Sequence, residues 1–219
     1  MNFINGLKRG AAVAAATTML MITGCGKELN LPDQKEKAVQ SGNTIVFTLH
    51  PDQAPITCAN FEKLVNEGFY NGLTFHRVVD NFMAQGGDPK GDGTGGDEIE
   101  SIKGEFTANG VNNELSHQRG VVSMARAMDY DSASCQFFIC YNGQYAETLD
   151  GNYAAFANVT EGMEVVDDFM KVDRDTNSLG EFAIPKNPII MEKVEMIEPD
   201  ASGEPRVKIT MNNFITESK

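Results

Sequence analysis

The chain has 219 residues, of which 41% are hydrophobic and 22% are charged, as in an ordinary globular protein. This length accommodates one domain with a sizeable core, or one domain with extensions. The formal net charge of −13 argues against nucleic-acid binding, which needs a basic surface, and no nucleic-acid partner is expected.

Residues 1–24 have the order of a signal peptide: basic residues, the apolar run AAVAAATTMLMI, then small residues. The apolar run is shorter than the ~20 residues needed to span a bilayer. The sequence ITGC at 22–25 resembles the bacterial lipobox. That resemblance implies cleavage before Cys25 and a diacylglycerol on its thiol. The alternatives are an uncleaved anchor or an ordinary secretory signal.

The expected location is therefore the extracytoplasmic face of the cell membrane, reached through a lipid anchor. Cleavage would remove two basic residues and leave 16 basic against 31 acidic residues, a net charge of −15. Such a chain gains no further attraction to anionic lipid. Residues 25–42 comprise the lipidated cysteine and a polar stretch without periodicity, which indicates a flexible tether.

The first element expected after the tether is a strand at 44–50, where TIVFTLH alternates between apolar and polar residues. A helix is expected at 54–67, because Pro55 suits a first helical turn and Gly68 suits a helix end. A second helix is expected at 162–171. Between and after the helices lie short apolar runs separated by turn residues, namely LTFHRVV, NFMAQGG, GVVSMAR, CQFFICY, YAAFANV and IIMEKVEMI.

Many short strands with two helices predict a mainly β fold, a closed antiparallel barrel capped by the helices. The expected domain spans residues 43–198. Residues 199–219 are polar and are expected to form a C-terminal extension with one strand at most, VKITM.

Three cysteines remain besides Cys25, an odd number for an exported protein. Cys135 and Cys140 are separated by an extended stretch of roughly 16 Å, too far for a disulfide. The hypothesis is that these two and Cys58 are buried free thiols that fill space as small apolar side chains.

The stretch GDGTGG at 91–96 has the spacing G-x-G-x-x-G of a dinucleotide-binding loop, but not its context. Two glycines and a proline precede it instead of a strand, and acidic residues follow it. A calcium loop starting at Asp88 would place Lys90 and Ile99 at ligand positions. The remaining interpretation is a tight glycine-rich surface turn.

The richest stretch is FHRVVDNFMAQGGDP at 75–89. It is followed by GDGTGG, by SMARA at 123–127, by CQFFI at 135–139 and by LDGNYAAF at 149–156. Each piece alone is a weak signal, since apolar residues and isolated arginines are common in any fold. Together, in this order and spacing, they resemble the cyclophilins over residues 43–198. That resemblance implies an eight-stranded barrel and assigns the glycine-rich stretch to a loop beside a peptide groove.

The resemblance also implies peptidyl-prolyl cis–trans isomerase activity (the EC 5.2.1.8 class), with no cofactor and no metal. Arg77 matches the family's catalytic arginine, and Phe82 and Gln85 complete the catalytic group. The positions that match substrate-binding residues are Met83, Gly93, Ala125, Arg126, Ala127, Gln136, Phe138, Thr148, Leu149 and Tyr153. The expected partners are proline-containing segments of exported proteins, and a monomer is expected.

Three positions depart from the family pattern. Thr148 replaces a pocket tryptophan that contacts cyclosporin, so weak cyclosporin inhibition is predicted. Tyr153 replaces a pocket histidine but keeps an aromatic wall with a polar tip. Arg126 stands where asparagine is common, and we expect it to favour acidic or polar residues beside the proline. His76 is expected to be a buried, hydrogen-bonded structural residue.

Two other functions remain open from the sequence. One is a binding module that holds proline-containing segments without turnover, although binding alone does not require Arg77. The other is a solute-binding lipoprotein, which would need a longer chain with alternating strands and helices. The histidines lack metal-ligand spacing, and no Ser-His-Asp arrangement is visible in the sequence.

Overall fold

A computed structural model of the chain describes residues 43–178 and 180–215. The signal peptide, the lipidated Cys25 and the tether predicted for residues 1–42 lie outside the described residues. Within the described part, no helix is both long enough and apolar enough to cross a membrane.

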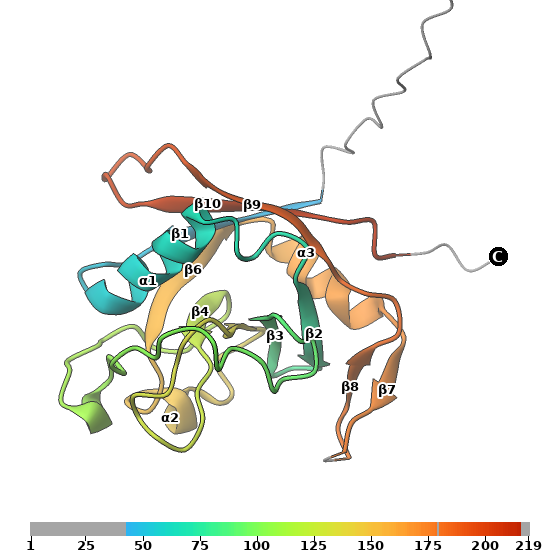
Figure 1. The fold of residues 1–219 in the computed structure, drawn as a ribbon, viewed down its shortest axis with the longest axis horizontal. Coiled ribbons are helices and arrows are strands. Elements are labelled where there is room, and N and C mark those ends of the chain that lie inside the picture. The colour runs from blue at the N-terminus through green and yellow to red at the C-terminus, as the bar shows by residue number, and fades with distance from the viewer. Residues whose placement is uncertain (1–42, 179, 216–219) are drawn as a thin grey trace, which may run out of the picture. The chain divides into compact units, whose positions relative to one another are not determined.

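The described residues form short strands interrupted by short helices (Figure 1). The helices are α1 (Pro55–Asn66), α2 (Ala146–Leu149) and α3 (Met163–Asp168), with 3-10 turns at Thr107–Asn109 and Phe169–Lys171. The strands are β1 (Thr44–Leu49), β2 (Thr74–Val79), β3 (Met83–Asp88), β4 (Val121–Met124), β5 (Phe137–Cys140), β6 (Ala155–Glu161), β7 (Arg174–Thr176), β8 (Phe182–Pro185), β9 (Met191–Ile197) and β10 (Arg206–Met211).

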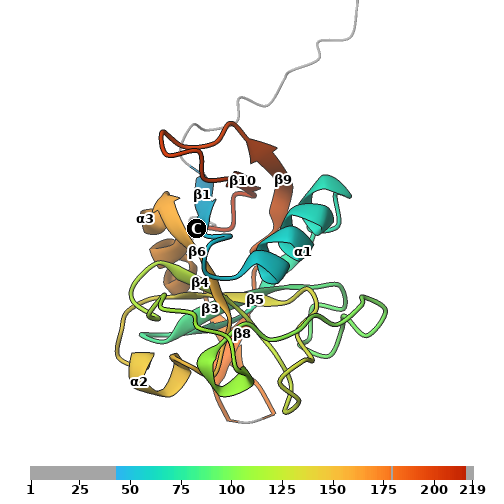
Figure 2. The same ribbon diagram turned by 90° about the vertical axis from the view of Figure 1, so that its left-hand side faces the viewer.

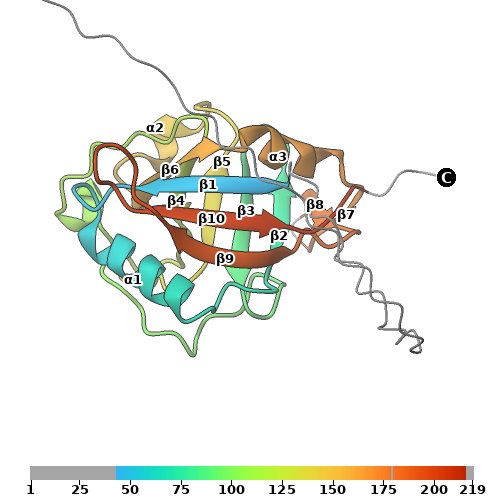
Figure 3. The same ribbon diagram turned by 90° about the horizontal axis from the view of Figure 1, so that it is seen from above.

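One antiparallel eight-stranded sheet dominates the fold, in the order β2-β3-β5-β4-β6-β1-β10-β9. The sheet curls, so that β1, β10 and β9 lie across β2 and β3 when seen from above (Figure 3). Strands β7 and β8 form a separate two-stranded hairpin, which packs beside β2. The interior is filled by one large apolar cluster that includes the rings of Phe47, Phe61 and Phe137.

The prediction of a closed barrel was wrong, because the sheet edges β2 and β9 do not pair along their length. They meet at one end, through an isolated bridge between Thr74 and Ile190 and backbone hydrogen bonds that join residues 72–75 to residues 189–191. Beyond this bridge, the Asn71 side chain accepts the hydrogen bond of the Val194 N–H at 2.8 Å. The result is a curled, open sheet. A closed barrel and a curled open sheet share the same alternation of apolar residues, so the sequence pattern does not separate them.

Helices α1 and α3 lie on opposite sides of the strands β1, β10 and β9 (Figure 2). The expected helix at 54–67 is α1, and the expected helix at 162–171 is α3 continued by a 3-10 turn. Helix α1 has no side-chain cap of its own. The buried Glu105 carboxylate instead accepts hydrogen bonds from the N–H groups of Ile56 and Thr57, at 3.0 and 2.8 Å, and so satisfies the helix start.

The C-terminal stretch contains the one strand expected there, VKITM, but this strand belongs to the main sheet and not to a separate extension. Residues 206–211 are strand β10, which lies inside the sheet between β1 and β9 and buries Val207, Ile209 and Met211. The stretch beyond residue 198 is thus part of the domain. Its polar appearance arises because the outward-facing residues of β10 alternate with the buried ones.

Candidate active site

Arg77 reaches the outer face of the sheet because β2 contains a bulge. Phe75 pairs with Gly86 and Arg77 pairs with Gln85, so that His76 is an extra residue between them. Phe75 and Val78 therefore face the core, while Arg77 lies on the opposite face. Strict alternation would have placed Arg77 on the same face as Phe75, inside the core.

Arg77 borders a cavity of about 170 Å³ on this outer face. A small apolar cluster separate from the main core forms its walls, with Met83, Phe138 and Leu149 buried in it. The complete lining is Arg77, Phe82, Met83, Gln85, Ala125, Arg126, Phe138, Leu149 and Tyr153. The cavity is smaller than a typical drug-binding pocket, and it suits one compact apolar group beside a permanent positive charge.

A second, larger cavity of about 340 Å³ adjoins the first and shares Gln85, Ala125 and Arg126 with it. Its walls are mostly polar and include Ala127, Gln136 and residues 93–97. Two neighbouring depressions, one lined mainly by apolar side chains and one mainly by polar groups, together form a groove.

A chain of side-chain hydrogen bonds links the two cavities. Arg77 Nη1 donates to Gln85 Oε1 at 3.1 Å, and Gln85 Nε2 donates to Gln136 Oε1 at 2.9 Å. Gln136 Nε2 in turn donates to the Gly95 carbonyl at 2.9 Å. The amide groups of both glutamines are thereby oriented along the groove, and the position of the glycine-rich loop is coupled to that of Arg77.

The glycine-rich loop is organised around the buried carboxylate of Asp88. This carboxylate accepts hydrogen bonds from the N–H groups of Lys90, Asp92 and Gly93. A Cβ atom at Gly95 would collide with Asp88 Oδ1, which explains the glycine there. The N–H groups of residues 91–94 are already bonded to residues 88 and 92, in agreement with the interpretation of this stretch as a turn.

Arg126 lines both cavities, but its guanidinium packs into an aromatic cage. It lies 4.7 Å from the ring centroid of Tyr153, 5.0 Å from that of Tyr130 and 5.2 Å from that of Phe106. Its Nε donates to the Asn152 carbonyl at 2.9 Å. The charge of Arg126 therefore supports the wall that carries Tyr153 as well as facing the groove.

The structure does not bring every expected residue to the groove. Thr148 is an exposed residue of α2 and lines neither cavity, whereas its neighbour Leu149 does. Tyr145, which the sequence did not single out, packs its ring 4.5 Å from that of Phe82. Gly93 and Ala127 border only the larger cavity.

His76 is buried as expected but is not hydrogen-bonded as expected. Neither of its ring nitrogens makes a hydrogen bond of normal geometry to a described residue. The bulge places the ring under the glycine-rich loop, where burial lowers the pKa of His76 and favours the neutral form. The three cysteines at 58, 135 and 140 are free and buried, which confirms the thiol hypothesis.

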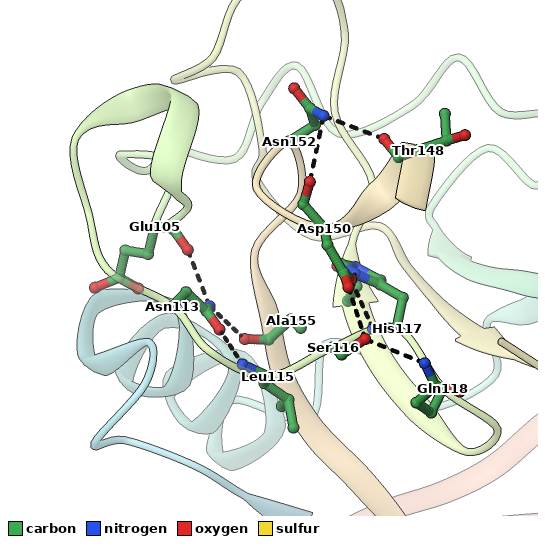
Figure 4. Close-up of polar contacts among 11 residues, drawn as sticks. Glu105, Asn113, Leu115, Ser116, His117, Gln118, Thr148, Asp150, Asn152 and Ala155 are labelled. Carbon is green, nitrogen blue, oxygen red and sulfur yellow. Dashed lines mark hydrogen bonds and ion pairs between the residues drawn. The ribbon is translucent and has the colours of Figure 1, made fainter. Parts of the chain in front are cut away.

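A Ser-His-Asp arrangement that the sequence did not reveal lies behind the smaller cavity. His117 Nδ1 donates to Asp150 Oδ1 at 2.7 Å (Figure 4). Ser123 Oγ lies 2.9 Å from His117 Nε2. Ser123 is completely buried, so its hydroxyl cannot meet a substrate. The His117 ring stacks on Phe138, with centroids 6.0 Å apart, and Asp150 directly follows Leu149. The network thus braces two walls of the cavity.

The pKa values of His117 and Asp150 in this network are both lowered. Burial lowers the pKa of His117, although the bond to Asp150 opposes this effect. Burial alone would raise the pKa of Asp150, but hydrogen bonds from Ser116 and His117 outweigh it and hold the pKa below 3.8. The pair therefore consists of a neutral imidazole and a carboxylate at neutral pH.

Arg77 has one further partner, which comes from the hairpin. Arg77 Nε donates to Glu181 Oε2 at 3.0 Å, and Nη2 donates to Glu181 Oε1 at 2.6 Å. The hydrogen bonds from Arg77 hold the pKa of Glu181 below its usual value. Glu181 lies far from Arg77 in the sequence, and the local sequence EFAIP does not predict this contact.

The chain is similar to known proteins along most of its length. The family model of cyclophilin-type peptidyl-prolyl cis-trans isomerases matches residues 37–196. Peptidyl-prolyl cis-trans isomerase A of Dickeya dadantii is 35% identical over 196 residues, which cover 85% of this chain and 88% of that one. Peptidyl-prolyl cis-trans isomerase B of Bacillus subtilis is 48% identical over 126 residues, 58% of this chain and 82% of that one.

Solved structures give the same result. A crystal structure of a cyclophilin-type isomerase from Cryptosporidium parvum, determined in the presence of the dipeptide Ala-Pro, superposes with a TM-score of 0.58 at 27% identity. The match covers 78% of this chain and 97% of that one. The chain belongs to the cyclophilin-type peptidyl-prolyl cis-trans isomerase family. Its curated relatives are named as enzymes of the isomerase class expected from the sequence.

Proposed function

We propose that this protein accelerates rotation about X–Pro peptide bonds, with Arg77 as the donor that favours the twisted state. The proposal rests on one observation: a permanently charged guanidinium borders a cavity whose other walls are mainly apolar, among them Phe82, Met83 and Phe138. The apolar walls suit a proline ring, and the guanidinium then lies beside the bond that rotates.

The chemical task is rotation without bond cleavage. An X–Pro bond has a barrier of ~18–20 kcal/mol and relaxes over tens to hundreds of seconds. As the amide twists, it loses resonance and the prolyl nitrogen gains a basic lone pair. A fixed donor aimed at that nitrogen binds the twisted state more strongly than the planar one, which lowers the barrier.

The size of this contribution can be bounded. One charge-assisted hydrogen bond is worth roughly 1.5–3 kcal/mol, or about one to two powers of ten in rate. The remaining acceleration has to come from holding the substrate. The apolar walls grip the ring, and Gln85 and Gln136 offer amide groups to the substrate backbone.

We further propose that the clients are exported proteins and that a lipid on Cys25 keeps the enzyme at the outer face of the membrane. Support comes from the signal-peptide order of residues 1–24 and from the resemblance of 22–25 to a lipobox. A single chain carries both cavities, so a monomer suffices for the reaction.

A non-catalytic binding module with the same fold is the alternative. The departure at Tyr153 favours it, since this residue lines the smaller cavity and differs from the family pattern. The presence of Arg77 on the cavity favours the enzyme.

Exchange NMR on a proline tetrapeptide, with the full chain purified in detergent, separates the two. We expect the wild type to accelerate exchange and Arg77→Ala to lose about 10- to 100-fold of that rate, because the donor is removed. Arg119→Ala is the matched control, since Arg119 pairs with Asp167 and lines neither cavity. Peptide binding without acceleration in the wild type would establish the binding module instead.

The anchor is tested separately by labelling cells with a lipid precursor. We expect the wild type to carry the label and to sediment with membranes, and Cys25→Ser to do neither. A labelled Cys25→Ser variant, or an unlabelled wild type, contradicts the lipid assignment and leaves the isomerase proposal intact.

A further inference from the structure

The hairpin of β7 and β8 packs beside the end of β2, the strand that carries Arg77 (Figure 1). Arg174 of β7 is almost completely buried and donates to the Val78 carbonyl at 3.0 Å. It also forms a two-pronged ion pair with Asp80, at 2.7 and 3.0 Å. The ring of Phe182 covers its guanidinium at 5.0 Å. The hairpin therefore has a defined position relative to β2.

The hairpin also orients its own carboxylate. Asn177 Nδ2 donates to Glu181 Oε2 at 2.7 Å, and the Glu181 N–H donates to Asn177 Oδ1 at 2.9 Å. Glu181 thus presents two oxygens in a fixed orientation to the Nε and Nη2 edge of Arg77, at 3.0 and 2.6 Å. Two parallel hydrogen bonds of this kind fix the plane of a guanidinium as well as its distance.

Glu181 contacts Arg77 from outside the cavity. Arg77 lines the smaller cavity, but Glu181 is not part of its lining. A residue that blocked the substrate would have to occupy the cavity, and Glu181 does not. Gln85 binds the guanidinium through Nη1, and among the described residues Nη1 has only the Met83 sulfur, at 3.8 Å, as a second acceptor. Nη2 donates to Glu181 Oε1, and its second hydrogen has no acceptor among the described residues. Donor capacity is therefore left for a substrate.

We propose that Glu181 is a positioning residue for the isomerisation, which holds the Arg77 guanidinium at the angle needed to donate to the prolyl nitrogen. This role rests on the proposed function. Without Glu181 the long arginine side chain samples other rotamers, and the ordering has to occur during each turnover. The carboxylate also weakens the positive field. That effect is screened by water, because the two side chains are 27% and 30% exposed. Orientation is not screened, so the net effect of Glu181 is acceleration.

The test compares Glu181→Gln and Glu181→Ala with wild type in the full chain, using exchange NMR on a proline tetrapeptide. We expect kcat to fall about threefold for Glu181→Gln and about tenfold for Glu181→Ala, corresponding to partial and complete loss of the two-pronged contact. KM should stay within about twofold, since Glu181 does not touch the cavity. Glu181→Asp keeps the charge and should recover part of the loss.

Two controls separate orientation from general damage to the hairpin. Asp175→Asn removes an ion pair with Lys186 on the same hairpin without touching Arg77, and it should leave kcat unchanged. The Nε–H proton of Arg77, assigned with Arg77→Lys, reports the contact directly. Its chemical shift should differ from that of a solvent-exposed arginine, and it should exchange slowly with water, in the wild type and in Asp175→Asn. Neither effect should be present in Glu181→Gln.

The outcomes are distinct. A lower kcat with constant KM and an unprotected Nε–H supports the positioning role. An unchanged kcat in both Glu181 variants overturns it, and so does a faster one, which would make Glu181 an inhibitory partner of Arg77. An inactive wild type overturns the proposed function and the positioning role together, whereas an active wild type with fully active variants overturns the positioning role alone.

Discussion

The two faces of strand β5 serve different purposes. Phe137 and Ile139 point into the main core, where the Phe137 ring makes edge contacts with four other aromatic rings. Phe138 and Cys140 point the other way, into the small cluster beneath the cavity. Adjacent phenylalanines of one strand thus contribute to two separate apolar clusters, the main core and the cluster that lines the cavity of the proposed site.

The largest expected effect follows from this contrast. We expect Phe137→Ala to lower the free energy of unfolding by about 3–5 kcal/mol, because it leaves a hole among rings that cannot move in to fill it. Phe138→Ala should cost no more than about half of that, since Phe138 already borders the smaller cavity on one side. Urea unfolding of both variants measures the difference.

The loss of isomerase activity should be larger for Phe138→Ala than for Phe137→Ala, the reverse of their order in stability. Phe138→Ala removes a wall for the proline ring worth about 1.5–3 kcal/mol, and we expect a loss of about 10- to 100-fold in kcat/KM. Phe137→Ala, assayed well below its unfolding midpoint, should retain most of the activity. Equal activity losses in the two variants would contradict the division between the two faces.

The next effect is the pH dependence of stability that arises from two buried histidines. His76 lies under the glycine-rich loop, and His117 lies behind the smaller cavity. Burial lowers the pKa of each below 6.5 in the folded state. The unfolded chain takes up these protons near pH 6.5 while the folded chain does not, so stability falls as the pH is lowered through 6.5. The free energy of unfolding can change by no more than about 1.4 kcal/mol per pH unit for each histidine.

Unfolding between about pH 7.5 and about pH 5 measures this slope, above the range in which carboxylates dominate. We expect His76→Phe to remove the contribution of one histidine to the pH dependence of the free energy of unfolding. The free energy of unfolding at about pH 7.5 should change little, because His76 makes no hydrogen bond of normal geometry. The exposed substitution Thr148→Val should leave the slope as it is. A slope that is the same in His76→Phe and wild type would show that His76 does not contribute.

The smallest expected effect is the charge preference of the larger cavity. Arg126 should favour an acidic over a basic residue beside the proline, by no more than about fivefold, because a partly exposed ion pair is worth only about 0.2–1 kcal/mol. Arg126→Gln should abolish this preference in a panel of charged tetrapeptides. Arg119→Gln should retain it. A panel without any difference in the wild type would mean that the aromatic cage keeps the guanidinium away from the substrate.

Much of the groove could be predicted because its residues cluster in a few short segments. FHRVVDNFMAQGG supplies one edge from β2 and β3, and CQFFI supplies the floor from β5. Once the family resemblance is seen, the order of these segments places Arg77, Phe82 and Phe138 together, and the structure brings all three to one cavity.

The remaining features depend on contacts between distant segments. The bulge at His76 decides on which face Arg77 lies, and alternation alone gives the wrong face. Glu181 meets Arg77 only because a separate hairpin packs beside β2. Thr148 lies in a helix of four residues, too short for a periodic signal, and the turn of that helix carries it away from the cavity.

The placement of β10 also has a consequence for the order in which the fold can form. Thr44, at the start of the sheet, pairs with Thr210, near the end of the described chain, and β9 has no partner in the sheet other than β10. During synthesis β1 emerges first and must wait for almost the entire domain before one of its edges is covered. Contacts of such long range make folding slow. The sheet can therefore be completed only after the last strand has emerged.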